Sequence, residues 1–272
     1  YPFVRWEDNL HVPMASGPRY DTFTSYPTFL RHWRSGAWPY PLLTSFGCPY
    51  QCTYCAARNR RWKARDLRNV VAEVHHAVDH LEVKRLAILD DCLNLRDTHV
   101  DAVCDVLRDT APWVAANGLR ADQLSEHQAA TMARAGCVAV GLGVETADPV
   151  LLASIQKGET LEQIEGGIAV AKMWFSSVSV YLIVGLPGSS YETDMRTLEW
   201  AARRGVYVHV SSYLDSPDGT LREGTFDVVP HVGRAYNPMD QLTVLAAARD
   251  LASPAADPWG TLGARWRVGR RW

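Results

Sequence analysis

The stretch PLLTSFGCPYQCTYC, residues 41–55, joins a short apolar run to a loop that holds three of the chain's six cysteines. Residues 41–46 predict a buried strand that ends where the loop begins. Cys48, Cys52 and Cys55 are separated by three and then two residues, so one loop can bring their sulfurs together. Disulfide scaffolds are usually small and secreted, so three such close cysteines favour a metal centre instead.

The composition narrows the class of protein. The 272 residues are enough for one large domain or two small ones, and 47% of them are apolar. The formal charge of -2 argues against a dedicated nucleic-acid-binding protein, which is usually clearly basic. The sequence has no apolar run of about 18 residues, the length of a membrane span, and no signal peptide, so we expect a reducing, cytoplasmic setting.

Strand-like and helix-like stretches alternate after the first 40 residues. Six such units predict a parallel sheet covered by helices, either as a partial barrel or as an open sheet. The motif SEHQ at 125–128 predicts a capping box that opens one helix. Strands are expected at 41–46, 85–91, 113–118, 138–146, 177–188 and 206–214, and helices from Asp66, around Val100, at 125–135, at 149–173 and at 191–202.

The two ends of the chain are less regular. Residues 1–40 are expected to form an extended lead-in against the main domain, and 223–272 a C-terminal extension with one helix at 240–251. The chain does not begin with Met, so an upstream domain could have been removed.

Acidic and glycine-rich motifs follow three of the expected strands. In parallel sheets the functional groups gather at the carboxyl ends of the strands. Asp90 and Asp91, Glu145 and the GLPG turn at 185–188 all fall there. The aspartates could instead cap the following helix, Glu145 could be an ordinary strand-end acid, and GLPG alone is only a turn.

Three thiolates are one short of the usual four ligands of a structural zinc or an iron–sulfur cube. A zinc site would need a fourth ligand, and no second close cysteine pair is present. A cube held by three cysteines leaves one iron open for a substrate or cofactor. Cys104 and Cys137 are expected in the core, and Cys92 either there or facing a cavity.

The cysteine spacing, with the aromatic Tyr54 before the third cysteine, resembles the signature of radical S-adenosylmethionine (SAM) enzymes. The resemblance covers about residues 40–222 and implies a partial (β/α)6 barrel. It departs from the family at Phe46, where a basic residue is common, and at Asp218, which is inserted between Pro217 and Gly219. Four further stretches are similar to the cobalamin-associated subgroup: RLAILDDCLNL, AGCVAVGLGVETAD, LIVGLPGSSYET and SPDGTLRE.

The resemblance implies that Cys48, Cys52 and Cys55 ligate a [4Fe-4S] cluster whose open iron binds SAM. One electron then cleaves SAM to methionine and a 5′-deoxyadenosyl radical, which takes hydrogen from a small-molecule or peptide substrate. A reductant such as flavodoxin or ferredoxin would supply the electron. The residue that acts on the substrate is not indicated.

The resemblance also implies SAM contacts, which are expectations here. Tyr54 would lie over the adenine, Asp90 and Asp91 would contact the amino group, and Arg120 the carboxylate. Glu145 would bond the ribose hydroxyls. The turn would shape the adenine pocket through Gly185, Leu186, Pro187 and Gly188.

The reaction stays open at this point. Members of the subgroup often methylate or rearrange natural products and carry a cobalamin domain, for which this chain has no room before Cys48. Cobalamin would therefore be a cofactor only if an upstream domain exists. The alternatives are a tRNA methylthiotransferase-like enzyme and a zinc-stabilised non-catalytic module. RNRRWKAR at 58–65 could bind phosphate or be a solvated loop with a tryptophan anchor.

Overall fold

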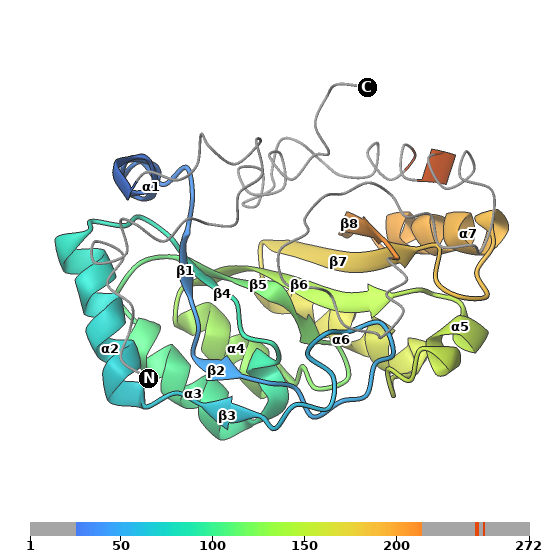
Figure 1. The fold of residues 1–272 in the computed structure, drawn as a ribbon, viewed down its shortest axis with the longest axis horizontal. Helices are drawn as coiled ribbons and strands as arrows, with labels where there is room; N and C mark the ends of the chain where they lie inside the picture. Colours follow the sequence, from blue (N-terminus) through green and yellow to red (C-terminus); the bar gives the residue numbers. More distant parts are fainter. Residues whose placement is uncertain (1–25, 214–242, 245–246, 248–272) are drawn as a thin grey trace.

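The computed structural model describes residues 26–213 together with Thr243, Val244 and Ala247 (Figure 1). One sheet has six parallel strands whose spatial order, β1-β4-β5-β6-β7-β8, follows the chain. Each connection therefore crosses over in the same sense, which curves the sheet into an open, partial barrel. The strands are β1 Tyr40–Leu42, β4 Leu86–Ile88, β5 Trp113–Arg120, β6 Cys137–Glu145, β7 Ser177–Val184 and β8 Tyr207–Ser212.

Helices connect these strands, and α3, α4 and α6 lie together on one side of the sheet in Figure 1. No helix among the described residues is long and apolar enough to cross a membrane. The helices after β1 are α2 Leu67–His75, continued by the π-helix η2 His76–His80, the short η3 Leu93–Leu95, α3 Asp97–Leu107, α4 Glu126–Arg134, α5 Pro149–Ser154, α6 Leu161–Trp174 and α7 Tyr191–Arg203.

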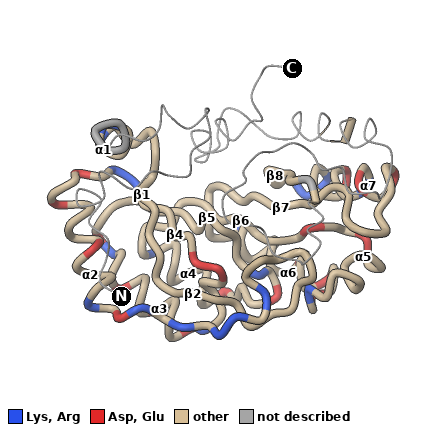
Figure 2. Tube along the Cα trace, in the orientation of Figure 1, with Lys and Arg blue, Asp and Glu red and all other residues tan. Residues whose placement is uncertain are grey.

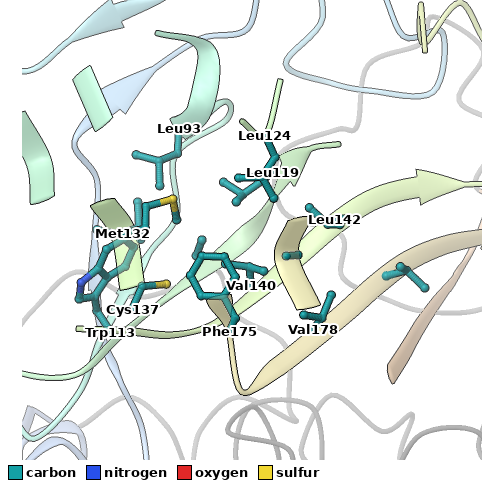
Figure 3. Close-up of a cluster of buried hydrophobic side chains, with 14 of the residues drawn as sticks. Leu93, Trp113, Leu119, Leu124, Met132, Cys137, Val140, Leu142, Phe175 and Val178 are labelled. Carbon is teal, nitrogen blue, oxygen red and sulfur yellow. The ribbon is translucent and has the colours of Figure 1, made fainter. Parts of the chain in front are cut away.

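Large apolar side chains fill the space between the sheet and these helices. Val140 and Leu142 of β6 are fully buried there, as is Ile164 of α6. Figure 3 shows part of this core, including Met132 of α4 and Cys137 at the start of β6. The predicted core placement of Cys104 and Cys137 is confirmed, and Cys92 is buried as well.

The opposite face of the sheet carries small side chains. Ala87, Val114 and Ala139 form a separate cluster there, as expected from the alternation of side chains along a strand. A Cβ atom added to Gly141 would lie 2.2 Å from Cε2 of Tyr181, so the tyrosine ring lies directly on this glycine. The Tyr181 hydroxyl donates to the backbone oxygen of Ala116 at 2.6 Å.

The predicted order of strands and helices is confirmed, but three boundaries are wrong. Residues 41–46 do not form one strand: β1 ends at Leu42, and Ser45–Phe46 form β2, which pairs antiparallel with β3, Lys63–Ala64. Part of the lead-in is helical instead of extended: residues Tyr26–Arg34 form α1, and Trp33 of this helix is buried against Tyr40. The predicted helix at 149–173 is two helices, because α5 ends at Ser154 and α6 begins at Leu161.

The predicted capping box is half right. Ser125 accepts from the backbone N–H of Gln128, but the Gln128 side chain donates instead to Asn94 O and to Asp97. The complete capping box lies at the start of α6, where Thr160 and Gln163 cap each other's backbone. The C-terminal extension 223–272 and the motif SPDGTLRE lie outside the described residues, apart from the three residues named above.

Candidate functional site

The three cysteines lie in a loop, residues 47–62, that leaves and re-enters the short β2–β3 ladder. The N–H of Arg60 donates to Cys48 O at 2.9 Å, and that of Asn59 donates to Tyr50 O at 2.7 Å. On the inner side, the N–H of Thr53 donates to Ile155 O at 2.9 Å. The two halves of the loop are therefore hydrogen-bonded to each other, and the loop is also bonded to Ile155, the residue that follows α5.

Gly47 opens the loop in a conformation that other residues rarely adopt, with φ of +82°. A Cβ atom at this position would lie 2.5 Å from Arg61 O, so the returning chain packs against the glycine backbone. The Gly47 N–H donates to Asp91 Oδ2 at 2.7 Å. Both contacts fix where the segment carrying Cys48 begins.

All three cysteines have free thiols. Cys52 is buried, and Cys48 and Cys55 are half-buried. A hydrogen bond from Cys92 lowers the pKa of Cys48 to about 6, against burial, whereas burial raises the pKa of Cys52 and of Cys55. Within residues 26–213, no three His, Cys, Asp or Glu side chains converge on a single metal ion. In a cluster each thiolate binds a different iron, so the donor set fits a three-cysteine [4Fe-4S] site.

Asp90 and Asp91 bind the chain that leads into the cysteine loop. Asp90 Oδ1 accepts from the Thr44 N–H at 2.6 Å, and its Oδ2 accepts from the Ser45 hydroxyl at 2.6 Å. The Thr44 hydroxyl also contacts Nε2 of His99 at 3.0 Å. Neither aspartate caps the next helix, so that alternative is wrong. Contact of either carboxylate with SAM stays a prediction.

Glu145 ends β6 with a φ of +69°, which is unusual for a residue with a side chain. Its Oε1 lies 3.2 Å from Nζ of Lys157, and that Nζ lies 3.5 Å from the Tyr54 hydroxyl. Burial and then Glu145 raise the pKa of Tyr54. Burial alone would lower the pKa of Lys157, but Glu145 and Glu159 outweigh it and raise that pKa. Tyr54 and Glu145, two residues predicted to contact SAM, thus both lie within hydrogen-bonding distance of the buried Lys157.

Arg120, at the end of β5, lies beside the cysteine loop. Its guanidinium donates to both carboxylate oxygens of Asp122, at 2.9 and 3.2 Å, and to Lys157 O at 3.0 Å. It also pairs with Glu159 at 3.2 Å and lies 3.5 Å from the centroid of the Tyr50 ring. The expected contact of Arg120 with the SAM carboxylate stays a prediction, since these partners already hold the side chain in place.

Glu159 is the most perturbed acid of this network. Its side chain is inaccessible to solvent. Burial raises its pKa to about 8, with Lys157 opposing the shift and a hydrogen bond to Asp122 adding to it. Burial also acts to raise the pKa of Asp122, but hydrogen bonds from Glu159 and Arg120 lower it overall. These shifts favour a protonated Glu159 and an ionised Asp122 near neutral pH, beside two buried cations.

The GLPG turn follows β7, next to the strand that ends in Glu145. The Gly185 N–H donates to Oδ2 of Asp194 at 2.9 Å, and the Ser189 N–H donates to Leu186 O at 2.8 Å. Leu186 is buried, while Gly188 has a φ of +88°. The turn has a fixed shape at the expected end of the sheet, and its contact with adenine, through Gly185 and Pro187, stays a prediction.

Sequence reasoning missed Lys157, Glu159 and Asp122. Lys157 and Glu159 lie in the segment between α5 and α6, which was predicted as helix. The signal was present: Gly158 is followed by a Thr-x-x-Gln capping box, which marks a new helix start. Asp194, a buried acid on the helix after GLPG, was also missed.

Comparison with known proteins identifies the family. The sequence profile of the radical SAM superfamily matches residues 42–201, and the chain belongs to this superfamily, whose members are enzymes that use a [4Fe-4S] cluster and SAM. The resemblance seen in the sequence is thereby confirmed.

Relatives in other organisms differ in their reactions. An uncharacterized methyltransferase of Pyrococcus horikoshii is 27% identical over 170 residues, covering 60% of this chain and 36% of the relative. The anaerobic magnesium-protoporphyrin IX monomethyl ester cyclase of Rubrivivax gelatinosus is 25% identical over 203 residues, covering 73% and 33%. The chain thus spans about a third of the length of these relatives.

Among solved structures, the fold is similar to that of TsrM from Kitasatospora setae, a radical SAM methyltransferase with cobalamin and a [4Fe-4S] cluster bound. The TM-score is 0.59 at 21% identity, over 68% of this chain and 38% of TsrM. Because the identity is low, this likeness supports the partial barrel and nothing finer.

Proposed function

We propose that this chain is the catalytic portion of a radical SAM enzyme that acts on a small-molecule or peptide substrate in natural-product biosynthesis. Methyl transfer is the outcome that the Pyrococcus relative favours, and the cyclase relative makes ring formation the next candidate. The observation that carries the proposal is the clamped loop with three free thiols at the carboxyl end of the sheet.

The residues have distinct tasks in this proposal. Cys48, Cys52 and Cys55 hold the [4Fe-4S] cluster. When bound, the cluster and SAM supply the one-electron cleavage of SAM to methionine and a 5′-deoxyadenosyl radical. The loop keeps the ligands in place through Gly47 and Asp91, so that little reorganisation is needed when SAM binds.

SAM would lie between the cysteine loop and the strand ends. Glu145, oriented by Lys157, accepts from the ribose hydroxyls, and the GLPG turn borders the adenine. The substrate would lie on the small-residue face of the sheet, where Tyr181 stacks on His209 at a centroid distance of 5.4 Å.

Three further points belong to the proposal. We divide the chain into a lead-in, residues 1–40, a catalytic unit, residues 41–222, and a C-terminal extension, residues 223–272. The setting is cytoplasmic, where thiols stay reduced. Cobalamin would be a further cofactor if a cobalamin domain belongs to the whole protein.

The test is anaerobic reconstitution with iron and sulfide. We expect a brown protein with four irons per chain, an electron paramagnetic resonance (EPR) signal after reduction, and SAM cleavage with dithionite. Cys55→Ala should lose the signal and at least about a thousandfold of the cleavage rate. Cys104→Ala, in the core, should keep both. A colourless zinc protein, or a Cys55→Ala protein that still cleaves SAM at its cluster, would refute the proposal.

A further inference from the structure

A strip of exposed cations borders the cysteine loop. Arg58, Arg60, Arg61 and Lys63, called the basic strip below, are all exposed, and residues 47–65 contain no acid. Within the described residues, the structure shows no ion pair for Arg60, Arg61 or Lys63. Figure 2 shows the blue segments of this stretch along the lower edge of the molecule. Because the whole chain has a charge of only -2, the strip is a local concentration of positive charge.

The basic strip is bonded to the backbone of two predicted cluster ligands. The N–H of Arg58 donates to Cys55 O at 3.3 Å, and that of Arg60 donates to Cys48 O at 2.9 Å. The returning chain at Arg61 also packs against Gly47, as described above. A protein bound to the strip would therefore be separated from the cysteine backbone by one segment of chain that is hydrogen-bonded to it. This gives an electron a short path to the cysteines.

Trp62 fixes the strip and closes one side of a cavity. Its indole N–H donates to Cys92 O at 3.1 Å, and its ring meets His99 edge to face. The guanidinium of Arg96 lies 5.0 Å from the ring centroid. Next to it opens a cavity of about 270 Å³, whose walls include Trp62, Leu67, Arg96 and Val103. The surface thus combines a cationic rim with an apolar pocket, the usual anatomy of a protein interface.

We infer that the basic strip and the adjoining cavity form the docking surface for a small acidic electron-transfer protein of the flavodoxin or ferredoxin class. The inference rests on the proposed function, which needs an electron at the cluster. The carrier gives up one electron, the cluster takes up one, and no bond or proton changes at the surface. Charge complementarity steers such a partner to the site and raises its association rate.

Nucleic acid fits this surface less well. Single-stranded RNA is usually bound by aromatic rings that are free to stack on bases. The Trp62 ring is half-buried and already contacts His99 and Arg96. The surface also lies beside the cysteine loop. Closeness to a redox centre favours binding of an electron carrier and gives RNA no advantage.

The experiment measures how fast reduced flavodoxin reduces the reconstituted full chain, by anaerobic stopped-flow absorbance. The test variant is Arg61→Glu with Lys63→Glu, and a milder version is Arg61→Gln with Lys63→Gln. The control is Lys84→Glu with Arg85→Glu, an equal change in charge at exposed residues before β4. Dithionite reduction and iron content report whether each variant keeps its cluster.

At about 20 mM salt, where charges are little screened, we expect the glutamate variant to be reduced at least tenfold more slowly by flavodoxin. The glutamine variant should fall in between, and the control should stay within twofold of wild type. The differences should shrink as salt increases. All variants should be reduced by dithionite to the same extent as wild type.

Two results would overturn the inference. One is equal flavodoxin rates for wild type and both strip variants when iron content is equal. The other is salt-sensitive binding of a tRNA transcript that the strip variants lose while flavodoxin reduction is unchanged. Absence of a cluster in the wild type would instead refute the proposed function, so the two failures are distinguishable.

Discussion

The two faces of the sheet are built on different principles. The helix-covered face is filled by aliphatic side chains such as Val140, Leu142 and Ile164, each with no exposed surface. The other face has glycine and alanine, and it ends in buried charges around Arg120 and Lys157. The first face supplies most of the stability through apolar burial. The second positions polar groups, at a cost that only complete ion pairing offsets.

The largest effect that would separate the two faces is expected from Lys157→Met. The variant removes the cation paired with Glu145 and leaves that carboxylate buried without an ion-pair partner, which should cost about 3–5 kcal/mol. It should also weaken SAM binding to the holoprotein by about tenfold or more, because Glu145 loses the partner that orients it. Anaerobic denaturation and equilibrium dialysis with SAM measure the two effects.

Leu142→Ala is the matched control for that variant. It removes a fully buried side chain from the helix-covered face and should cost a similar 2–5 kcal/mol. SAM binding should stay within about twofold of wild type, since Leu142 belongs to the apolar core between the sheet and the helices. If both variants weakened SAM binding equally, Lys157 would act only through stability, and the distinction between the faces would not hold.

A smaller effect is expected where α6 packs against the chain after β5. Gly166 and Gly167 are neighbours on this helix, but a Cβ atom at Gly167 would lie 2.4 Å from Ala121 O. Gly167→Ala should therefore destabilise the fold by about 1–3 kcal/mol. A Cβ atom at Gly166 meets nothing within 4 Å, so Gly166→Ala should stabilise it by about 0.5–1 kcal/mol. Urea unfolding of both variants measures the difference in sign, and equal values would show that α6 is not held this closely.

The helix-covered face could be predicted from the sequence, because its information is local. Apolar residues recur with the helical period in 67–81, and β6 reads as a buried strand from its own residues. The position of the cysteine loop after the first strand was also predictable, since its three cysteines are close together in the chain. The same holds for Asp90, Asp91 and Glu145, which follow strands whose ends meet at one edge.

The polar network could not be predicted in the same way. Lys157 is twelve residues after Glu145 and about a hundred after Tyr54, and only the packing of α5 under the loop joins them. Asp90 serves Thr44 and Ser45 instead of the helix that follows it, a choice that depends on how β1 pairs with β4. The partners of such side chains are determined by tertiary contacts, and short-range sequence patterns carry little information about those partners.

The last effect is a dependence of stability on pH, and it concerns the proton on Glu159. The pKa of Glu159 is about 8 in the folded protein and 4.5 in an ordinary setting. Between these values the folded protein holds a proton that the unfolded chain releases. The free energy of unfolding should therefore decrease as pH rises through this window, by up to about 1.4 kcal/mol per pH unit.

Glu159→Gln removes the titrating group and keeps a donor for Asp122, so this part of the pH dependence should disappear. Glu162→Gln, at an exposed position in the first turn of α6, should keep the wild-type slope. The measurement is anaerobic urea denaturation at several pH values between 5 and about 8. Each variant is compared with wild type, so that the opposite contribution of Cys48, whose folded-state pKa is about 6, cancels. A Glu159→Gln slope equal to that of wild type would mean that Glu159 is ionised in the folded protein. The buried network would then hold three carboxylates, Glu145, Asp122 and Glu159, around its two cations, one more negative charge than proposed.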